Sequence, residues 1–394
     1  MKIVLFDHFF EPGFPGVSGL SDLVWNWARE LVAMGDEVHI VAPYPPNIEP
    51  PLGAIVHRFP VPPMGYRNIV GQMLTVLRGW VEVRRIRDVQ VIHLPEYVAA
   101  GILAVLCHPT PVVLTTPGSI FERIENVNHA DWFTTQVYKI MARVSARRCA
   151  RIIATSAEMA RWWEFSGAQA EKVVQIPLGV DTRTFRRIPG ARATLGWQDS
   201  PCVLFVGRFQ SENGAKFAIR AMASVAERIP TAMLHMVGWG PEQHELEQLT
   251  ESLGLTHRVA WHGRVPLAEL PLYYSASDVF VLPRLSRVTP RALFEAMACG
   301  LPVVVSEVGG MGEFIQPGST GFVVDPRDCQ HIAGLVIELL RNSDTALNLG
   351  RNARAFACTN LDWSFIVDRM RTVYEHVGLP PVVRAPYREG NGHQ

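Results

Sequence analysis

Short runs of β-branched and aliphatic residues alternate with longer segments of helical period along most of the chain. The pattern begins with an apolar run at 3–6, continues with a helix-period segment at 20–34 and returns to an apolar run at 38–42. Since a parallel pair of strands needs a crossover connection, which is usually a helix, this rhythm indicates parallel sheets covered by helices. The sequence therefore predicts an α/β fold.

The rhythm occurs in two sets, separated by a passage rich in turn residues. The first set ends with apolar runs at 91–93, 112–116 and 152–155, and the second has runs at 203–206, 233–237, 259–261, 279–282 and 303–305. Between them, 186–200 carries proline, glycine and several arginines, which favours a linker. We therefore expect two doubly wound parallel-sheet domains facing a cleft, 1–185 and 186–362, with 363–394 packing back on the first.

Composition narrows the class of protein. The 394 residues include 37 basic and 37 acidic ones, so no excess of charge points to nucleic acid. The six cysteines are scattered singly, which fits neither a disulfide framework nor a zinc site and favours a reducing, cytoplasmic setting. We expect no signal peptide, because Asp7 and His8 interrupt the apolar start of the chain. We expect no membrane span, because the longest apolar run, 97–107, falls short of the ~20 residues that cross a bilayer. Segment 69–83, with Arg78 and Trp80, is either core-facing or a weak contact with a membrane surface.

The segment 286–300, SRVTPRALFEAMACG, combines a helix start with a carboxylate. Thr289 is a good N-cap and Pro290 suits the first helical position, so the N–H groups of Arg291 and Ala292 should point out of the helix toward a phosphate. Glu295 follows them. The alternative interpretation is an ordinary capped helix.

Four further residues follow runs that are expected to form strands. Arg208 follows the first apolar run of the second set, and its guanidinium group suits a phosphate. Gly309 and Gly310 follow the run 303–305, and Gly19 follows the first run of the chain. Glycine lets a backbone approach a ligand closely, although each of these positions can equally be a solvated strand end or a tight turn.

Several segments together resemble the retaining glycosyltransferases of family 4, which have the GT-B fold. In the second half these are VGRF, GWGPE at 238–242, HGRV at 262–265, YSASDVFVLP at 274–283 and ALFEAMACGLPVVVS. In the first half, SGLSDLVWNWARELVAMGDEVHIVAP and IPLGVDTRTF look like the same family. The resemblance covers residues 1 to about 376, with the motifs in the expected order.

This resemblance implies a role for each candidate residue. Arg208 would hold the donor diphosphate, assisted by the N–H groups of Arg291 and Ala292 beside Thr289, and Glu295 would hold the ribose hydroxyls. The other contacts implied are those of Gly19 with the diphosphate, of Arg264 and Val265 with the base, and of Gly309 and Gly310 with the edge of the donor.

Three positions depart from the family pattern. Asn213 stands where the family usually has a lysine, Arg287 stands where it has a glutamate, and Pro117, before Gly118 on the acceptor side, stands where it often has a histidine. The family's arginine, lysine and two glutamates sum to zero charge, whereas the residues here sum to plus one. We therefore expect the site still to attract an anion.

The sequence thus favours sugar transfer, with retention, from a nucleotide-diphosphate sugar to a small-molecule or glycan acceptor. No metal and no further cofactor are expected, because arginine can neutralise the leaving diphosphate. Two alternatives stay open: a catalytically degenerate homologue that binds nucleotide or glycan as a partner, and a nucleotide-sugar epimerase or coupling enzyme on the same fold.

Overall fold

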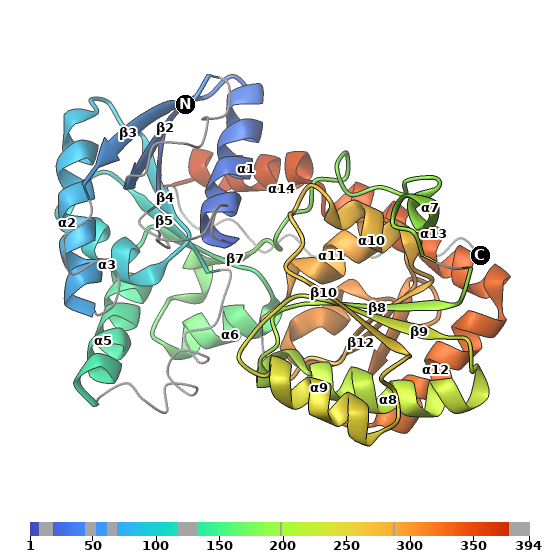
Figure 1. The fold of residues 1–394 in the computed structure, drawn as a ribbon. Coiled ribbons are helices and arrows are strands. Elements are labelled where there is room, and N and C mark those ends of the chain that lie inside the picture. Colours follow the sequence, from blue (N-terminus) through green and yellow to red (C-terminus); the bar gives the residue numbers. More distant parts are fainter. Residues whose placement is uncertain are drawn as a thin grey trace. The chain divides into compact units, whose positions relative to one another are not determined.

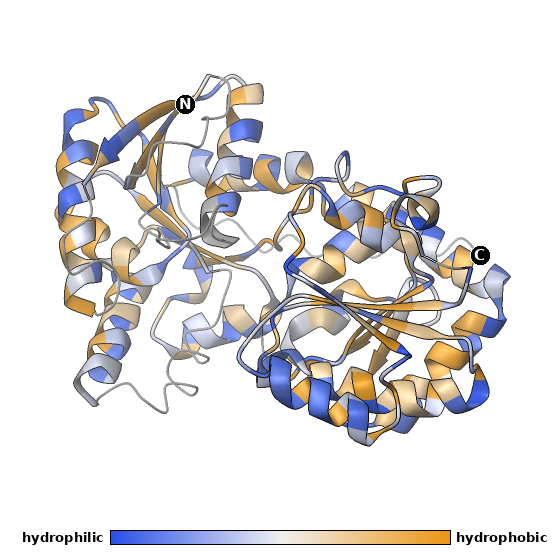
Figure 2. Ribbon diagram, in the orientation of Figure 1, coloured by the Kyte–Doolittle hydropathy of each residue, from blue (hydrophilic) through white to orange (hydrophobic). Residues whose placement is uncertain are grey.

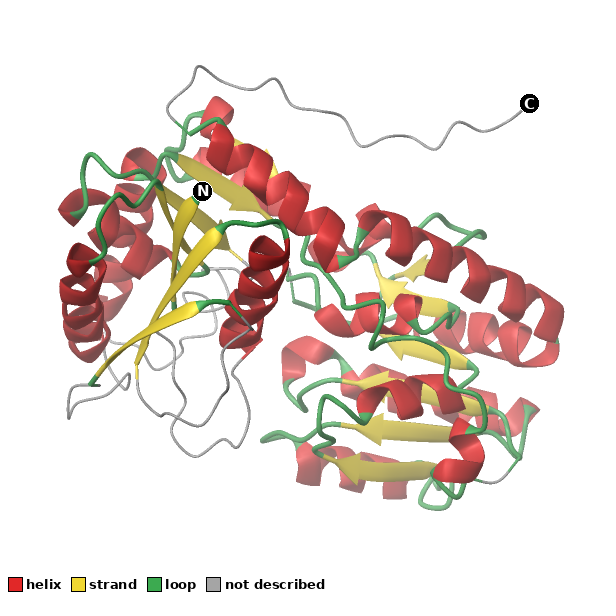
Figure 3. Ribbon diagram, turned by 90° about the horizontal axis from the view of Figure 1, so that it is seen from above, coloured by secondary structure: helices red, strands yellow, loops and turns green. Residues whose placement is uncertain are grey.

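The computed structural model describes residues 1–7, 19–43, 53–60, 69–116, 132–197, 199–286 and 288–377. The chain forms two compact units: unit 1 is Met1–Pro177 with Val367–Gln394, and unit 2 is Leu178–Ile366. Each unit contains one sheet with helices packed against it (Figures 1 and 3). The expected pair of parallel α/β sheets is therefore confirmed.

The sheet of unit 1 has seven strands in the order β3-β2-β1-β4-β5-β6-β7, and all its pairings are parallel. Its strands are β1 (Lys2–Phe6), β2 (Glu37–Pro43), β3 (Ile55–Phe59), β4 (Val91–Leu94), β5 (Val112–Thr116), β6 (Arg151–Ala154) and β7 (Val173–Gln175). The strand order reverses between β1 and β4, because β2 and β3 extend from one side of β1 and β4 to β7 from the other. Ile3 of β1 lies opposite Val38 of β2 and Val91 of β4.

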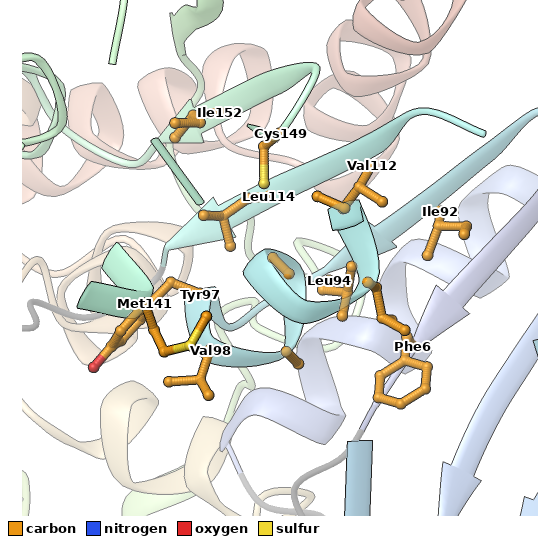
Figure 4. Packing of buried hydrophobic residues seen from close by; sticks show 14 of the residues in the cluster. Phe6, Ile92, Leu94, Tyr97, Val98, Val112, Leu114, Met141, Cys149 and Ile152 are labelled. Carbon is orange, nitrogen blue, oxygen red and sulfur yellow. The ribbon is translucent and has the colours of Figure 1, made fainter. Parts of the chain in front are cut away.

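Helices pack on the sheet of unit 1. They are α1 (Gly19–Ala33), α2 (Ile69–Arg85), α3 (Tyr97–Leu106), α5 (Trp132–Arg148), α6 (Ala157–Phe165) and the end of α14 (Trp363–Glu375). Helices α2, α3 and α5 lie side by side (Figure 1) and share one large apolar core with the sheet. Figure 4 shows this core, to which β4 contributes Ile92 and Leu94 and α3 contributes Tyr97 and Val98.

The sheet of unit 2 has six parallel strands in the order β10-β9-β8-β11-β12-β13. They are β8 (Cys202–Val206), β9 (Met233–Val237), β10 (Val259–Gly263), β11 (Val279–Leu282), β12 (Val303–Ser306) and β13 (Gly321–Val324). Four of the strands are buried along their whole length or all but one residue, as expected for a sheet covered on both faces. Figure 2 shows these strands as apolar.

Helices α8 (Ala215–Arg228), α9 (Gln243–Ser252) and α12 (Cys329–Arg341) cover one face of this sheet. Helices α10 (Leu270–Ala276), α11 (Arg291–Ala298) and α13 (Ser343–Asn360) cover the other (Figure 1). Among the described helices, none combines the length and the apolar character needed to cross a bilayer.

The passage 186–200 does not behave as a free linker. It contains the short helix α7 (Ala191–Thr194), and the guanidinium group of Arg192 is 2.6 Å from the carboxylate of Asp278. The N–H group of Ile188 donates to the hydroxyl of Ser275 at 2.9 Å. These bonds tie the passage into unit 2, which begins at Leu178 rather than at 186.

Helix α14 passes from one unit to the other, because its residues from Val367 onward belong to unit 1. In unit 1, Arg371 forms an ion pair with Asp36 at 2.9 Å, and the hydroxyl of Tyr374 lies 2.6 Å from Nδ1 of His93. Nε2 of His93 lies 2.7 Å from the hydroxyl of Thr115. A buried imidazole in the sheet thus holds the end of the last described helix.

Candidate functional site

The candidate residues of unit 2 follow strands at one edge of its sheet. The strand order reverses between β8 and β11, because β9 and β10 extend from one side of β8 and β12 and β13 from the far side of β11. In open α/β sheets, ligands bind beyond the carboxyl ends of the strands at such a reversal. Arg208 follows β8, and the segment leading to α11 follows β11. The structure therefore places both segments beyond the carboxyl ends of strands at the reversal.

Hydrogen bonds join the two segments. The carbonyl oxygen of Glu212 accepts from the N–H groups of Leu285 and Ser286, at 2.8 and 3.2 Å. Gly214, with φ of 71°, packs so closely that a Cβ atom there would overlap the carbonyl oxygen of Pro283. Only glycine combines this conformation with this close approach. The segments after β8 and β11 are thus held together. We call these two joined segments the wall of the candidate site.

Asn213 supports that wall from inside. Its side chain is buried, and its Nδ2 atom donates a hydrogen bond to the carbonyl oxygen of Arg208 at 2.8 Å. The amide therefore fixes the backbone that carries the arginine. Because Asn213 stands where the family's phosphate-binding lysine would be, the sequence also predicts that it contacts the sugar donor, and this stays a prediction.

The side chain of Arg208 is exposed. Its guanidinium carbon lies 5.4 Å from the ring centroid of Trp239, which is 40% exposed and follows β9. A cation over an indole face is attracted by the ring quadrupole. Trp239 therefore orients the guanidinium group of Arg208, which stays accessible to an anion.

The start of α11 differs from the prediction. Pro290 occupies the N-cap, with φ of −79° and ψ of 141°, and the helix begins at Arg291. Thr289 does not cap the helix, because its hydroxyl donates to the carbonyl oxygen of Gly309 at 2.9 Å. Because Pro290 is itself extended rather than helical, the helix starts one residue later than predicted. The first N–H groups of a helix point out of its N-terminus, and here they include those of Arg291 and Ala292.

Glu295 lies on α11 one turn after Arg291. Its Oε2 atom accepts a hydrogen bond from the hydroxyl of Tyr274 at 2.9 Å, and both side chains are buried. Burial raises the pKa of Glu295, while the positive charge of Arg291 and the bond from Tyr274 oppose this shift. The carboxylate is thus positioned by a neighbour on α10.

Gly309 and Gly310 both have left-handed backbones, with φ of 81° and 72°. A side chain would strain two successive positions of this kind, so the turn after β12 requires glycine. The bond from Thr289 to Gly309 ties this turn to the segment before α11. The turn therefore belongs to the same wall.

Arg264 and Val265 follow β10 directly; Arg264 is exposed and Val265 is half-buried. The N–H group of Gly238 donates to the carbonyl oxygen of Gly263 at 2.8 Å, which joins the segments after β9 and β10. Both predicted base-binding positions thus lie at the same edge of the sheet as Arg208.

Three predicted site residues, Pro117, Gly118 and Arg287, lie outside the described residues. Gly19 is the first residue of α1, which follows β1 in unit 1. This is one side of the reversal between β1 and β4. In the part of the chain that the structure describes, no group of three histidine, cysteine or acidic residues could hold a metal ion.

Sequence reasoning missed two residues of this site. Tyr274 begins the motif YSASDVFVLP, but nothing in the motif indicates that its hydroxyl bonds Glu295. Trp239 lies within GWGPE, and its approach to Arg208 depends on β8 and β9 being neighbours. The motifs marked both positions without indicating their contacts.

Two family models match the chain, one in each half. "Glycosyltransferase Family 4" matches residues 17–184, and "Glycosyl transferases group 1" matches residues 190–356. The second range includes all the donor-side residues described in unit 2. Together the two models cover most of the chain.

Similar proteins agree with these models. A GDP-mannose-dependent alpha-(1-6)-phosphatidylinositol monomannoside mannosyltransferase of Mycolicibacterium smegmatis is 34% identical over 48% of this chain and 52% of its own length. The match thus spans about half of that relative. A D-inositol 3-phosphate glycosyltransferase of Thermomonospora curvata is 26% identical over 92% of each chain.

Solved structures share the fold. Sucrose-phosphate synthase from Thermosynechococcus elongatus has a TM-score of 0.81 and 24% identity, covering 95% of this chain and 98% of that chain. Anabaena HepE in complex with UDP has a TM-score of 0.74 and 22% identity, covering 95% and 100%. At such identities the likeness shows the architecture alone. With the two family models, it establishes that this chain belongs to the GT-B glycosyltransferases of group 1 and family 4.

Proposed function

We propose that this protein transfers a sugar from a nucleotide-diphosphate sugar to a hydroxyl acceptor, with retention of anomeric configuration. The observation that carries the proposal is the wall at the reversal of the unit 2 sheet. There an exposed arginine, Arg208, shares one edge with the start of α11, and a buried carboxylate, Glu295, follows on that helix. Cation, N–H groups and carboxylate match a diphosphate next to a ribose.

Catalysis in this proposal depends on charge rather than on a side-chain base. Arg208 and the N-terminus of α11 stabilise the negative charge that develops on the leaving diphosphate. The leaving phosphate itself takes the proton of the acceptor hydroxyl on the face where the new bond forms, which retains the configuration. Because arginine neutralises the diphosphate, we propose that neither a metal ion nor another cofactor is required.

The partners proposed are a nucleotide-sugar donor and a small-molecule or glycan acceptor. The names of the relatives support this, since the mannosyltransferase is described as GDP-mannose-dependent and HepE was solved with UDP. Weak contact with a membrane surface is part of the proposal, supported by exposed apolar residues of α2 such as Leu74 and Leu77. We place the protein in the cytoplasm, because all six cysteines are unpaired.

The first experiment identifies the base. Binding of UDP, GDP, ADP and dTDP is compared by thermal shift, because a ligand at 100 times its Kd stabilises the folded state by about 2.7 kcal/mol. Sugars of the preferred nucleotide are then incubated with the protein, with and without acceptors. Arg208→Ala is the test variant, and Arg228→Ala, an exposed arginine on α8, is the control.

The outcomes separate the candidate functions. Release of nucleoside diphosphate that Arg208→Ala abolishes and Arg228→Ala does not supports transfer. Tight binding without turnover in a broad acceptor panel would instead support the degenerate binding homologue, which the loss of a lysine at Asn213 favours. An isomerised sugar formed without acceptor would support the epimerase.

A further inference from the structure

The outward sides of helices α2, α3 and α5 carry more apolar residues than expected of a solvent-facing helix layer. On α2, Val70, Leu74, Leu77 and Val81 are between 41% and 49% exposed. They are four, three and four residues apart, so they form one stripe along the helix. The opposite side, with Val76 and Val83, packs into the core of unit 1. The stripe is thus an apolar face without a partner among the described residues.

The same character continues on the neighbouring helices. Val105 at the end of α3 is 52% exposed, and Ile140 of α5 is 55% exposed. Of the fifteen large hydrophobic residues that are exposed in the described chain, eight lie on these three helices. We call the outward side of α2, α3 and α5 the α2–α3–α5 surface. Such a concentration marks an interaction surface rather than scattered exposure.

The charged residues of these three helices are mostly basic. The three helices contain seven basic residues, three on α2 and four on α5, and one acidic residue, Glu82. All seven basic residues are exposed, whereas Glu82 is half-buried and paired with Arg85 at 2.8 Å. The three helices thus carry a formal excess of six positive charges in a chain whose net charge is zero. The rest of the chain is correspondingly negative.

We infer that the α2–α3–α5 surface docks on an anionic lipid bilayer. Apolar side chains that enter the interface, flanked by lysine and arginine, are the combination that holds a peripheral protein on such a membrane. A second copy of this chain is a poorer occupant, because pairing the surface with itself would oppose two sets of positive charges. The inference sharpens the weak membrane contact proposed above and does not depend on glycosyl transfer, because vesicle binding needs neither donor nor acceptor.

The test is co-sedimentation of the full chain with vesicles of phosphatidylcholine, alone or with 30% phosphatidylglycerol. We expect binding to the anionic vesicles only, and a loss of about tenfold or more in apparent affinity when salt rises from about 0.1 to 0.5 M. Equal binding to both kinds of vesicle, or to neither, would overturn the inference.

Two sets of variants locate the surface. Leu74→Gln with Leu77→Gln should weaken vesicle binding about fivefold or more, while Leu253→Gln with Leu347→Gln, two exposed leucines of unit 2, should not. Likewise, replacing Lys139, Arg143 and Arg147 of α5 with glutamine should cost at least about tenfold.

The matched charge control replaces Arg228, Arg327 and Arg351, three exposed arginines of unit 2, with glutamine. If these controls lose as much affinity as the α5 variant, general charge rather than this surface binds the lipid, and the inference is wrong. It is also wrong if the wild type is a dimer in solution and Leu74→Gln with Leu77→Gln makes it a monomer. An unchanged circular dichroism spectrum and melting temperature in every variant show that the variants are folded.

Discussion

The hydroxyl of Tyr274 donates a hydrogen bond to Oε2 of Glu295 across the α10–α11 contact, at 2.9 Å, with both side chains buried. A buried carboxylate without such a partner is strongly disfavoured. One carboxylate oxygen is thus fixed by the protein. The tyrosine positions Glu295, and the two residues should therefore differ in how their loss affects ligand binding and stability.

We predict that Glu295→Ala weakens nucleoside diphosphate binding by about 1 to 3 kcal/mol, because a ribose hydroxyl loses its acceptor. Tyr274→Phe should weaken binding less, yet lower the free energy of unfolding by about 1 kcal/mol through the lost bond. Calorimetric titration and urea unfolding measure the two effects. Unchanged affinity in Glu295→Ala would remove the ribose assignment.

A second prediction concerns Arg208 and Trp239. Arg208→Ala should reduce diphosphate affinity by about 1.5 to 3 kcal/mol and leave nucleoside affinity almost unchanged, because only the diphosphate carries the charge. Trp239→Ala should reduce it by about 0.5 to 1 kcal/mol, and Trp239→Phe by less, since an aromatic face is kept. Equal losses for nucleoside and diphosphate would place Arg208 away from the phosphates.

The third prediction is that Arg287 supplies the positive charge that the family's lysine would provide at Asn213. Arg287→Ala should then lower diphosphate affinity by about 1.5 to 3 kcal/mol and spare nucleoside affinity. Asn213→Lys combined with Arg287→Glu should bind diphosphate more tightly than Arg287→Ala, even though it loses the bond to the carbonyl of Arg208. If the double variant binds no better, the two positions do not compensate each other.

A fourth prediction tests the wall between the segments after β8 and β11. Gly214→Ala should lower both stability and nucleotide affinity, because its methyl group would overlap the backbone of Pro283. Gly254→Ala is the matched control, with φ of 68° and no atom within 4 Å of the added carbon. In this control the free energy of unfolding should fall only by the backbone strain of alanine at positive φ, about 1 kcal/mol. Similar melting temperatures for the two variants would show that the close approach is unimportant.

The fifth prediction concerns pH. Burial lowers the pKa of His93 from its usual 6.5 to about 3, so between these values the unfolded chain binds a proton that the folded chain does not. The contribution to stability is therefore complete above 6.5 and falls as the pH drops toward 3, by up to about 1.4 kcal/mol per pH unit.

His93→Gln removes this titration. Compared with the wild type, its midpoint of urea unfolding should fall less between pH 7 and pH 5, although it starts lower because the bonds to Thr115 and Tyr374 are altered. His331→Gln, an exposed histidine of α12, should keep the wild-type pH dependence. If the unfolding midpoint of His93→Gln falls with pH in parallel with that of the wild type, His93 does not contribute to the pH dependence of stability between pH 7 and pH 5.

The alternation of apolar runs and helix-period segments predicted two parallel α/β sheets, and the motifs predicted the family. Both follow from local sequence, because a strand buried on both faces must be continuously apolar. Three strands were not predicted: β3, β7 and β13, each at the edge of its sheet. In β3, Ile55 is exposed and only Phe59 is fully buried, so its sequence, IVHRF, needs no continuous apolar run.

Contacts between distant segments were decided by the tertiary structure. The sequence indicated that Arg208, Asn213, Thr289 and Glu295 belong to a donor site, but not that Asn213 bonds the backbone of Arg208, nor that Thr289 bonds Gly309 instead of capping α11. A polar side chain has several possible partners within reach along the chain. Which one it bonds depends on which strands become neighbours, and strand order is a property of the whole sheet.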